Sequence, residues 1–385
     1  MKRVVIVTAN RYPCGDAGAL RQHATAKIFK ELGYSVVIAG YGEFTGKKML
    51  VYDGIEYTSF RPNTQNKFVR LIYKALYGKR VLKFIQRNYP DVSVIFVVDM
   101  LPYAFKILSK YAKRKNIILV HDSVEWYSPE EFKRGEKDIG YQLKEQTNRK
   151  MVGKGWRVMA ISTYLEDHFA KTTDRAVRVP VIMDIESIEN NLDVLDTNKT
   201  TFAYVGSPLR KDYLKEIVEG FCLLRKEMLL DIELNIVGVN FQQLQDVCGI
   251  SKETLDKLKG VLVAHGRLPH DEAVRYVREA DYTLLIRDAS LRYAKAGFPT
   301  KIVESLACGT PPVCNLSSDL AMYLKHGKNA ILADGHAPEQ IKIALESAIL
   351  TTLEERTTLR RNARETAEKC FDYRQYISEM DKLLK

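Results

Sequence analysis

Short apolar runs that end in small or polar residues recur along the first half of the chain. The first is RVVIVTAN, and the runs lie at residues 3–10, 35–39, 92–100, 116–122 and 157–162. Continuous apolar runs of this length are typical of strands buried on both faces of a parallel sheet. A Pro/Gly-rich loop at 12–18 and a helical pattern at 20–32 connect the first two runs into a βαβ unit. This half of the chain therefore predicts a doubly wound α/β sheet.

The second half of the chain restarts the same pattern. Its apolar runs lie at residues 201–207, 231–238, 260–266, 282–288 and 310–316, with helical patterns at 213–225 and 270–279. Because 385 residues exceed what one hydrophobic core usually organises, we expect two domains. A proline and a change in net charge near residue 180 mark the joint, which gives domains of residues 1–180 and 181–370. The amphipathic segment 371–385 is expected to fold back near this joint.

One stretch, AKAGFPTKIVESLACGTPPV at residues 294–313, predicts a short buried helix. Thr300 is a good N-cap residue, and Gly309 supplies the stop. The other face of this helix carries Lys301, Glu304, Ser305 and Cys308. Free N–H groups at a helix N-terminus favour anions, so Lys301 and Glu304 indicate a place to hold a phosphate. A solvated salt bridge on an ordinary helix is the alternative, and this segment alone leaves both open.

The composition is that of a globular protein, with 46% hydrophobic and 28% charged residues. The six cysteines form no C-x-x-C pair and no Cys/His metal spacing, which predicts free thiols in a cytoplasmic protein. No run approaches the roughly 18 apolar residues that a spanning helix needs. Any contact with a membrane is therefore expected to be peripheral.

The formal charge of +11 is concentrated in the first half of the chain. Residues 1–178 hold 32 Lys and Arg against 17 Asp and Glu, whereas residues 179–385 hold 27 against 31. One helical pattern has a basic face of Lys67, Arg70 and Lys74 and an apolar face of Phe68, Leu71, Ile72 and Ala75. A basic amphipathic helix can lie on an anionic membrane surface. The alternative is a solvated basic face over an ordinary core contact.

The two predicted parallel sheets indicate where ligands bind. In open parallel sheets, ligands bind outside the carboxyl ends of the strands. Two such sheets that face each other form a central cleft with strand-end loops on both walls. The loops expected to line this cleft are residues 15–18, 121–122, 206–211, 266–268 and 297–304.

The order of motifs along nearly the whole chain resembles that of GT-B glycosyltransferases, in particular the large retaining family of glycosyltransferase group 1. The motifs are YPCGDAGALRQHA at 12–24, VHDSVEW at 120–126, AIS at 160–162, VPVIMD at 179–184, YVGSPLRKDYLKEIVEGF at 204–221, VAHGRLPHDEAVRYVREADYTLLI at 263–286 and FPTKIVESLACGTPPV at 298–313. None of these motifs is strong alone, but their shared order and spacing make the resemblance specific. The resemblance implies a GT-B fold with two Rossmann-like domains.

The resemblance also implies that the second domain binds a nucleotide-activated sugar. Lys211 is expected to meet the diphosphate, and Glu304 is expected to accept hydrogen bonds from the ribose hydroxyls. Main-chain N–H groups near residues 297–301 are expected to bind phosphate oxygens, and residues 267–268 lie where the family recognises the base. The implied donor-binding residues are Gly15, Gly18, Gly206, Ser207, Arg210, Lys211, Arg267, Leu268, Gly297, Phe298, Thr300, Lys301 and Glu304.

The first domain is expected to present the acceptor hydroxyl. Gly15 and Gly18 bound a loop that approaches the diphosphate and the acceptor, and Asp16 and Asp122 are placed on the acceptor side. His121 matches a family histidine near the sugar or the leaving phosphate, which makes it a catalytic candidate together with Lys211 and Glu304. The alternative for His121 is a strand-end histidine satisfied by the backbone. The alternatives for Asp122 are a partner for His121 and a helix cap.

Two positions depart from the family's pattern. Ala296 stands where the family usually has a first glutamate, and Ser207 stands where an arginine is common, with Arg210 nearby. The resemblance implies transfer with retention at the anomeric carbon. It implies neither a cofactor nor a metal, and the chain has no Asp-x-Asp segment suited to a nucleotide-bound divalent ion.

The expected function is a glycosyltransferase of cell-surface polysaccharide or glycolipid synthesis, with a lipid-linked or saccharide acceptor. It is expected in the cytoplasm, or peripherally at the inner membrane face. Nucleic acid is not an expected partner, because no aromatic stacking platform accompanies the positive charge. A sugar-nucleotide epimerase of the same architecture is one alternative, and a partner protein that binds a nucleotide sugar without transferring it is another. Ala296 favours the partner protein that binds without transferring. The lack of a GxGxxG fingerprint argues against a dehydrogenase.

Overall fold

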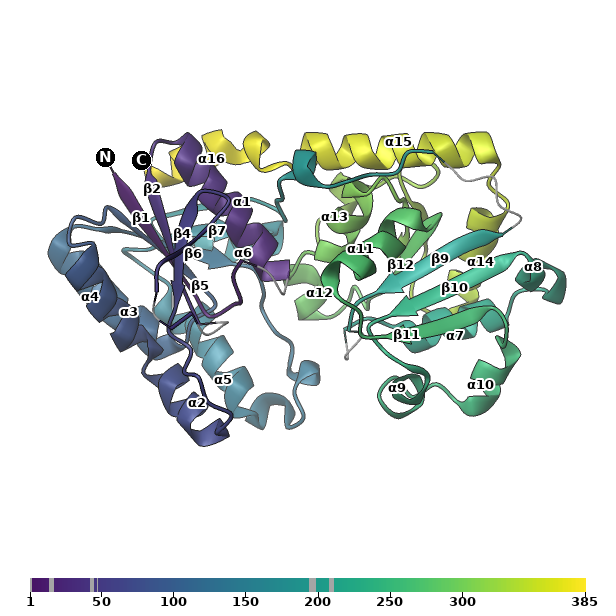
Figure 1. Ribbon diagram of the computed structural model, residues 1–385, viewed down its shortest axis with the longest axis horizontal. Helices are drawn as coiled ribbons and strands as arrows, with labels where there is room; N and C mark the ends of the chain where they lie inside the picture. The colour runs from purple at the N-terminus through teal and green to yellow at the C-terminus, as the bar shows by residue number, and fades with distance from the viewer. Residues whose placement is uncertain (1, 14–16, 42–44, 47, 194–198, 208–210) are drawn as a thin grey trace. The chain divides into compact units, whose positions relative to one another are not determined.

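The chain folds into two compact α/β units, each built around its own sheet (Figure 1). The structure is a computed structural model that describes residues 2–385 except 14–16, 42–44, 47, 194–198 and 208–210, and that leaves out the side chains of Ala17 and Leu71. The first unit comprises Met1–Asp184, Ala296–Phe298 and Tyr373–Lys385, and the second comprises Ile185–Lys295 and Pro299–Asp372. The prediction of two doubly wound sheets is confirmed.

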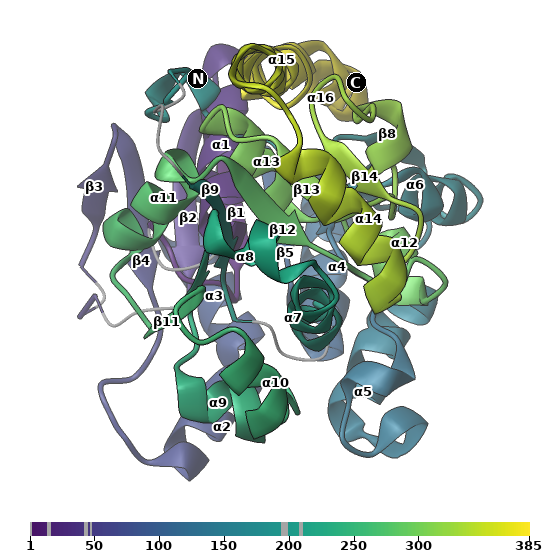
Figure 2. The ribbon, with the colours of Figure 1, turned by 90° about the vertical axis from the view of Figure 1, so that its right-hand side faces the viewer.

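The sheet of the first unit has eight strands in the order β3-β4-β2-β1-β5-β6-β7-β8. The strands are β1 (Arg3–Thr8), β2 (Ser35–Gly40), β3 (Leu50–Tyr52), β4 (Ile55–Ser59), β5 (Val94–Val98), β6 (Ile118–Ser123), β7 (Arg157–Ala160) and β8 (Arg175–Arg178). All neighbours are parallel except β3, which pairs antiparallel with β4 at the edge (Figure 2). The central strands β1 and β5 are almost wholly buried valine, isoleucine and phenylalanine, as strands covered on both faces require.

The helices of the first unit cover this sheet and include the end of the chain. They are α1 (Ala17–Glu31), α2 (Lys67–Ala75), α3 (Tyr77–Asn88), α4 (Pro102–Lys115), α5 (Ile139–Gln146), α6 (Thr163–Ala170) and α16 (Ile377–Leu384). The core joins strand residues such as Ile6 and Phe96 to Phe29 of α1 and to Met380 and Leu383 of α16. The last helix is therefore part of the hydrophobic core of the first unit.

The sheet of the second unit has six parallel strands in the order β11-β10-β9-β12-β13-β14. The strands are β9 (Thr200–Val205), β10 (Ile232–Val237), β11 (Leu262–Gly266), β12 (Tyr282–Leu285), β13 (Pro312–Asn315) and β14 (Ile331–Ala333). In its centre Phe202 of β9 stacks on Tyr282 of β12 with ring centres 5.6 Å apart. Both aromatic rings are fully buried.

Helices cover both faces of the second sheet. They are α7 (Leu214–Cys222), α8 (Lys226–Leu230), α9 (Phe241–Asp246), α10 (Lys252–Lys257), α11 (His270–Glu279), α12 (Arg292–Ala296), α13 (Thr300–Ala307), α14 (Pro338–Ile349) and α15 (Leu353–Cys370). Helix α14 packs beside α7, and the long α15 packs on α13 (Figure 2). Among the described residues, the structure has no helix with the length and apolarity needed to cross a bilayer.

Each sheet has one point where the strand order reverses. In the first unit this switch point lies between β1 and β5, and in the second unit it lies between β9 and β12. Loops diverge to opposite sides at a switch point and leave a crevice at the carboxyl ends of the two strands. These two places are therefore where the fold prepares ligand sites.

Candidate active site

Three glycines close the carboxyl ends of adjacent strands in the second unit. Gly206 follows β9, Gly238 follows β10 and Gly266 ends β11, and their φ angles are 143°, 113° and 69°. The N–H of Gly238 donates to the carbonyl oxygen of Gly266 at 2.7 Å. A Cβ atom on Gly238 would lie 2.1 Å from the carbonyl oxygen of Gly206. Only glycine therefore allows these strand ends to approach so closely.

Lys301 of α13 crosses over Gly206 into the switch point of the second sheet. A Cβ atom on Gly206 would lie 2.4 Å from the Cε atom of Lys301, and the φ angle of 143° is one that favours glycine. The Lys301 ammonium donates to the hydroxyl of Tyr204 at 2.9 Å and to the carboxylate of Asp212. Arg287, which follows β12, donates from Nε to the same carboxylate at 3.2 Å. Lys301, Asp212 and Arg287 thus form one charged cluster, which we call the switch-point cluster.

The switch-point cluster carries a net charge of +1, because two cations share one carboxylate. Burial by itself raises the pKa of Asp212, but the charges of Lys301 and Arg287 outweigh it and lower that pKa below its usual range. The carboxylate is therefore ionised. An ammonium has three N–H donors, and Lys301 uses one for Tyr204 and one for Asp212. Among the described residues, one N–H donor of Lys301 and one net positive charge are left for an anion.

Glu304 lies one turn beyond Lys301 in α13 and is half-buried. Its carboxylate has no hydrogen-bond or ion-pair partner among the residues that the structure describes. Burial raises the pKa of Glu304 from 4.5 to about 7, and the charge of Lys301 opposes the rise. A half-buried carboxylate without a partner has lost hydrogen bonds to water and has no protein hydrogen bond to replace them. This side chain is therefore ready to accept hydrogen bonds from hydroxyl groups.

The start of α13 differs from the prediction in two ways. The helix begins at Thr300 itself, so Pro299 occupies the N-cap position and no side chain caps the helix. The extended backbone of Pro299 precedes the helix directly and moves its start by one residue. Ser305, predicted on the open face, is buried, donates to the carbonyl of Thr310 at 2.6 Å and shares a hydrogen bond with Thr283. Cys308 is buried as well.

Lys211 lies in the loop between β9 and α7 and is half-buried. Its ammonium lies 5.7 Å from the ring centre of Tyr293, and its carbonyl oxygen accepts a hydrogen bond from the Tyr293 hydroxyl at 2.9 Å. Ser207 is exposed directly after Gly206. The contact with Tyr293 fixes the loop beside the switch-point cluster. The predicted Arg210 lies outside the described residues.

The residues predicted to recognise the base lie at the neighbouring strand end. Arg267 and Leu268 follow Gly266 at the end of β11, and the N–H of Gly238 bonds to the Gly266 carbonyl there. Arg267 is exposed and Leu268 is half-buried. The second unit thus brings the strand-end candidates onto one edge of its sheet.

His121 lies inside the core of the first unit, with 5% of its surface exposed. The side chain sits in β6, where Nδ1–H donates to the carbonyl of Val97 at 3.2 Å. The rings of Phe105 and Phe169 pack against the imidazole edge to face, with centres 5.1 and 6.0 Å away. Burial lowers the pKa of His121 from 6.5 to about 4, so the ring is neutral at pH 7. This is the backbone-satisfied strand histidine that the sequence left open, and a catalytic role for His121 stays a prediction.

We expect the first unit to lose stability in mild acid because of His121. Its pKa is lower in the folded chain than in the unfolded chain, so its contribution is complete above pH 6.5 and is lost as the pH falls towards 4. The loss amounts to about 3 kcal/mol over this range, and it is absent in His121→Asn. Urea unfolding at pH 7 and pH 5 measures about 2 kcal/mol of this loss, because pH 5 lies above the folded-state pKa of about 4. Equal pH dependence in both proteins contradicts the assignment.

Asp122 is also buried, and it makes an ion pair with Arg21 of α1. The guanidinium reaches the carboxylate through Nη2 at 2.9 Å and through Nε at 3.1 Å. Arg21 donates as well to the carbonyl of Val179 at 3.1 Å and to that of Pro180. Asp122 therefore ties α1, β6 and the segment after β8 together. Neither the pairing with His121 nor the helix cap considered from the sequence describes this contact.

The remaining candidates lie in the first unit. Gly18 is the second residue of α1, and Gly15 and Asp16 fall outside the described residues. Gly297 and Phe298 follow α12 and are grouped with the first unit. The carbonyl of Ala296, at the position of the family's first glutamate, accepts a hydrogen bond from Ser162 at 2.6 Å.

Comparison with protein families agrees with the site in the second unit. Residues 188–366 match the family model described as glycosyl transferases group 1. This match covers less than half of the chain, and it makes that part similar to the glycosyltransferase group 1 family. A relative, an uncharacterized glycosyltransferase of Methanocaldococcus jannaschii, is 21% identical over 286 residues and covers 71% of this chain and 69% of its own length.

Solved structures with similar folds cover the whole chain. Sucrose-phosphate synthase of Thermosynechococcus elongatus matches with a TM-score of 0.76 at 13% identity, over 100% of this chain and 98% of its own. A glycosyltransferase of Rickettsia africae matches with a TM-score of 0.69 at 16% identity, over 100% and 98%. HepE of Anabaena, solved with UDP and glucose, matches with a TM-score of 0.67 at 16% identity, over 100% and 99%. The fold is therefore that of the GT-B glycosyltransferases.

Proposed function

We propose that this protein transfers a sugar from a nucleoside-diphosphate sugar to an acceptor hydroxyl, with retention at the anomeric carbon and without a metal. The observation that carries the proposal is the unpartnered carboxylate of Glu304 beside the positively charged switch-point cluster. The carboxylate suits the two hydroxyls of a ribose, and the cluster suits the diphosphate next to it. The complex of HepE with UDP and glucose supports UDP as the first nucleotide to test.

In the proposed reaction the acceptor oxygen forms a bond to the anomeric carbon as the bond to the diphosphate breaks. The acceptor proton passes to the departing diphosphate, which leaves with the electron pair. Negative charge grows on the diphosphate during this step, so cations held near it lower the barrier. Lys211 and the remaining donor of Lys301 are proposed for that role. Among the described residues no group of three His, Cys, Asp or Glu side chains is placed to hold a metal.

The first unit is proposed to bind a lipid-linked or saccharide acceptor. Its sequence carries the excess positive charge of the chain, which suits an anionic acceptor or an anionic membrane surface. This supports a place in cell-surface polysaccharide or glycolipid synthesis, in the cytoplasm or peripherally at the inner face of a membrane.

A thermal-shift screen tests the donor site. A ligand that binds only the folded state raises the melting temperature, so one family among UDP-, GDP-, ADP-, CMP- and dTDP-sugars is expected to give a shift. The anomeric configuration of the product, read by NMR, then tests retention. A metal chelator is expected to leave the rate unchanged. If none of these sugar nucleotides raises the melting temperature at saturating concentration, the proposal is contradicted.

A binding protein without transfer activity is the second candidate. It is favoured by Ala296, because a side chain of one methyl group cannot contact a sugar hydroxyl as a glutamate does. This candidate predicts a thermal shift with a donor but neither transfer nor donor hydrolysis. The sugar-nucleotide epimerase instead predicts a new sugar nucleotide formed without any acceptor.

A further inference from the structure

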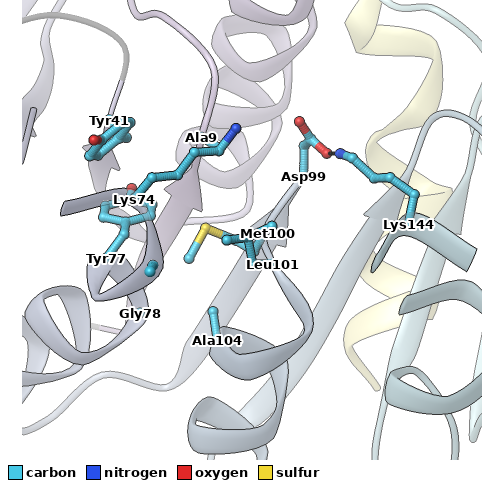
Figure 3. Close-up of a pocket in the computed structure, with 11 residues that line it drawn as sticks. Ala9, Tyr41, Lys74, Tyr77, Gly78, Asp99, Met100, Leu101, Ala104 and Lys144 are labelled. Carbon is cyan, nitrogen blue, oxygen red and sulfur yellow. Dashed lines mark ion pairs between the residues drawn. The ribbon is translucent and has the colours of Figure 1, made fainter. Parts of the chain in front are cut away.

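A pocket opens at the switch point of the first sheet, and none of the described donor-binding candidates is among its lining residues (Figure 3). Ala9 follows β1 and Asp99 follows β5, so both switch-point strands end at this pocket. Asp99 has a φ angle of 44°, a left-handed conformation that non-glycine residues rarely adopt. Such strain gathers at ligand sites, where the surrounding structure holds it in place. The fold thus presents a second crevice, separate from the switch-point cluster of the second unit.

The walls of this pocket are basic. Lys144 of α5 pairs with Asp99, while Lys74 of α2 has no ion-pair partner within the described part of the chain. Figure 3 shows the Lys74 side chain extending from α2 towards the strand ends. Burial raises the pKa of Tyr41 in the same pocket, and the positive charges of nearby Arg61, Arg80 and Arg70 oppose the rise. Because the single carboxylate already has a partner, the pocket is suited to an anion.

The helix that supplies Lys74 is held at the pocket but is not covered. At its end the hydroxyl of Tyr77 lies 2.6 Å from the carbonyl oxygens of Thr8 and Ala39, which fixes the start of α3 against β1 and β2. None of the described side chains of α2 is buried. Phe68 is 68% exposed and Ile72 is 41% exposed. The alternative of an ordinary core contact, which the sequence left open for this apolar face, therefore does not describe these two residues.

A nine-residue helix is marginal in water unless its apolar face packs against something. The apolar stripe of Phe68, Ile72 and Ala75 runs beside Lys67 and Lys74, which share one side of α2. Aromatic and aliphatic side chains next to lysines are the composition of helices that lie at a lipid interface. Lys74 and Ala75 also line the pocket, so the apolar stripe continues into the anion site.

We propose that this pocket binds the phosphate of a lipid-borne acceptor, with α2 lying on the membrane that carries the lipid. Lys74 contacts the phosphate, and Phe68 and Ile72 enter the apolar layer next to it. The inference rests on the proposed function and names the acceptor class for it. An amphipathic phosphate fits because one short helix supplies both the cation and the apolar surface.

Vesicle flotation with the full chain tests the inference. The probes are neutral phosphatidylcholine vesicles, the same vesicles with phosphatidylglycerol, and the same vesicles with a polyprenyl monophosphate at equal surface charge. We expect the tightest binding to the polyprenyl monophosphate vesicles. Lys74→Gln is expected to weaken that binding roughly fivefold, and Phe68→Ser or Ile72→Ser about tenfold.

Matched controls separate this site from general attraction to a charged surface. Lys113 of α4 and Val51 of β3 are exposed, so Lys113→Gln and Val51→Ser are expected to bind as the wild type does. Equal losses in Lys74→Gln and Lys113→Gln overturn the inference, as does equal binding to both anionic vesicles. If a donor raises the melting temperature in solution but the protein does not bind vesicles, the inference is overturned and the proposed function stands. Vesicle binding without a donor shift overturns the proposed function alone.

Discussion

Asp122→Asn is expected to lower the free energy of unfolding of the first unit by about 3–5 kcal/mol. The substitution keeps the shape of the side chain and removes its charge, which leaves the guanidinium of Arg21 buried without a counter-ion. The carbonyls of Val179 and Pro180 still accept hydrogen bonds from Arg21, but they carry no full charge. Urea unfolding followed by tryptophan fluorescence isolates the first unit, because the two tryptophans of the chain, Trp126 and Trp156, both lie in it.

The first unit also supplies a control ion pair with a nearly equal shortest distance. Arg3 and Asp91 form an ion pair at 2.8 Å, against 2.9 Å for Arg21 and Asp122, but the Asp91 side chain is 59% exposed. Asp91→Asn is therefore expected to cost less than about 1 kcal/mol. If the free energy of unfolding falls by the same small amount in both variants, water reaches the Arg21 pair and the anchoring role of Asp122 is wrong.

Glu304→Ala is expected to weaken donor binding by about 10- to 100-fold. Hydrogen bonds to a charged group are worth about 1.5–3 kcal/mol, and the truncation removes those to the ribose. Titration calorimetry with the nucleotide found in the screen measures the loss. The control is Glu339→Ala, an exposed glutamate in the first turn of α14 of the same unit. Equal affinity of the two variants means that the ribose does not meet Glu304.

The pH dependence of donor binding gives an independent test of the same carboxylate. Burial holds the pKa of Glu304 at about 7, so the protonated and charged forms are both populated near neutral pH. The charged form accepts hydrogen bonds more strongly, and donor affinity is expected to rise between pH 6 and pH 8. In Glu304→Gln the affinity is expected to stay level over this range. A rise of equal size in both proteins assigns it to another group.

The central strands were predictable because burial on both faces leaves a continuous apolar run in the sequence. RVVIVT and VIFVV carry that signal, and both form strands at the centre of the first sheet. The edge strands β3 and β8 carry little of it, since LVY is only three residues long and RAVR is half polar. Their pairing depends on neighbours far away in the chain, which a local pattern does not contain.

The residues of the candidate site also divide into those that the local sequence predicts and those that it does not. Lys301 and Glu304 were found together because one helical turn brings them together. Asp212 was missed, although it directly follows Lys211, because its partners Arg287 and Lys301 are 75 and 89 residues away. Only the strand order places those three side chains at one switch point. The surroundings of His121 were also beyond the local sequence, because its aromatic neighbours come from helices that the motif does not include.

The return of α16 to the first unit affects how the chain is made. Tyr373, Met380 and Leu383 complete the core that begins with β1, so residues 1–184 lack part of their interior until the last helix leaves the ribosome. At about 5–20 residues per second, the delay between Asp184 and Tyr373 is roughly 10 to 40 s. During that time the incomplete first unit exposes an apolar surface that a chaperone can bind.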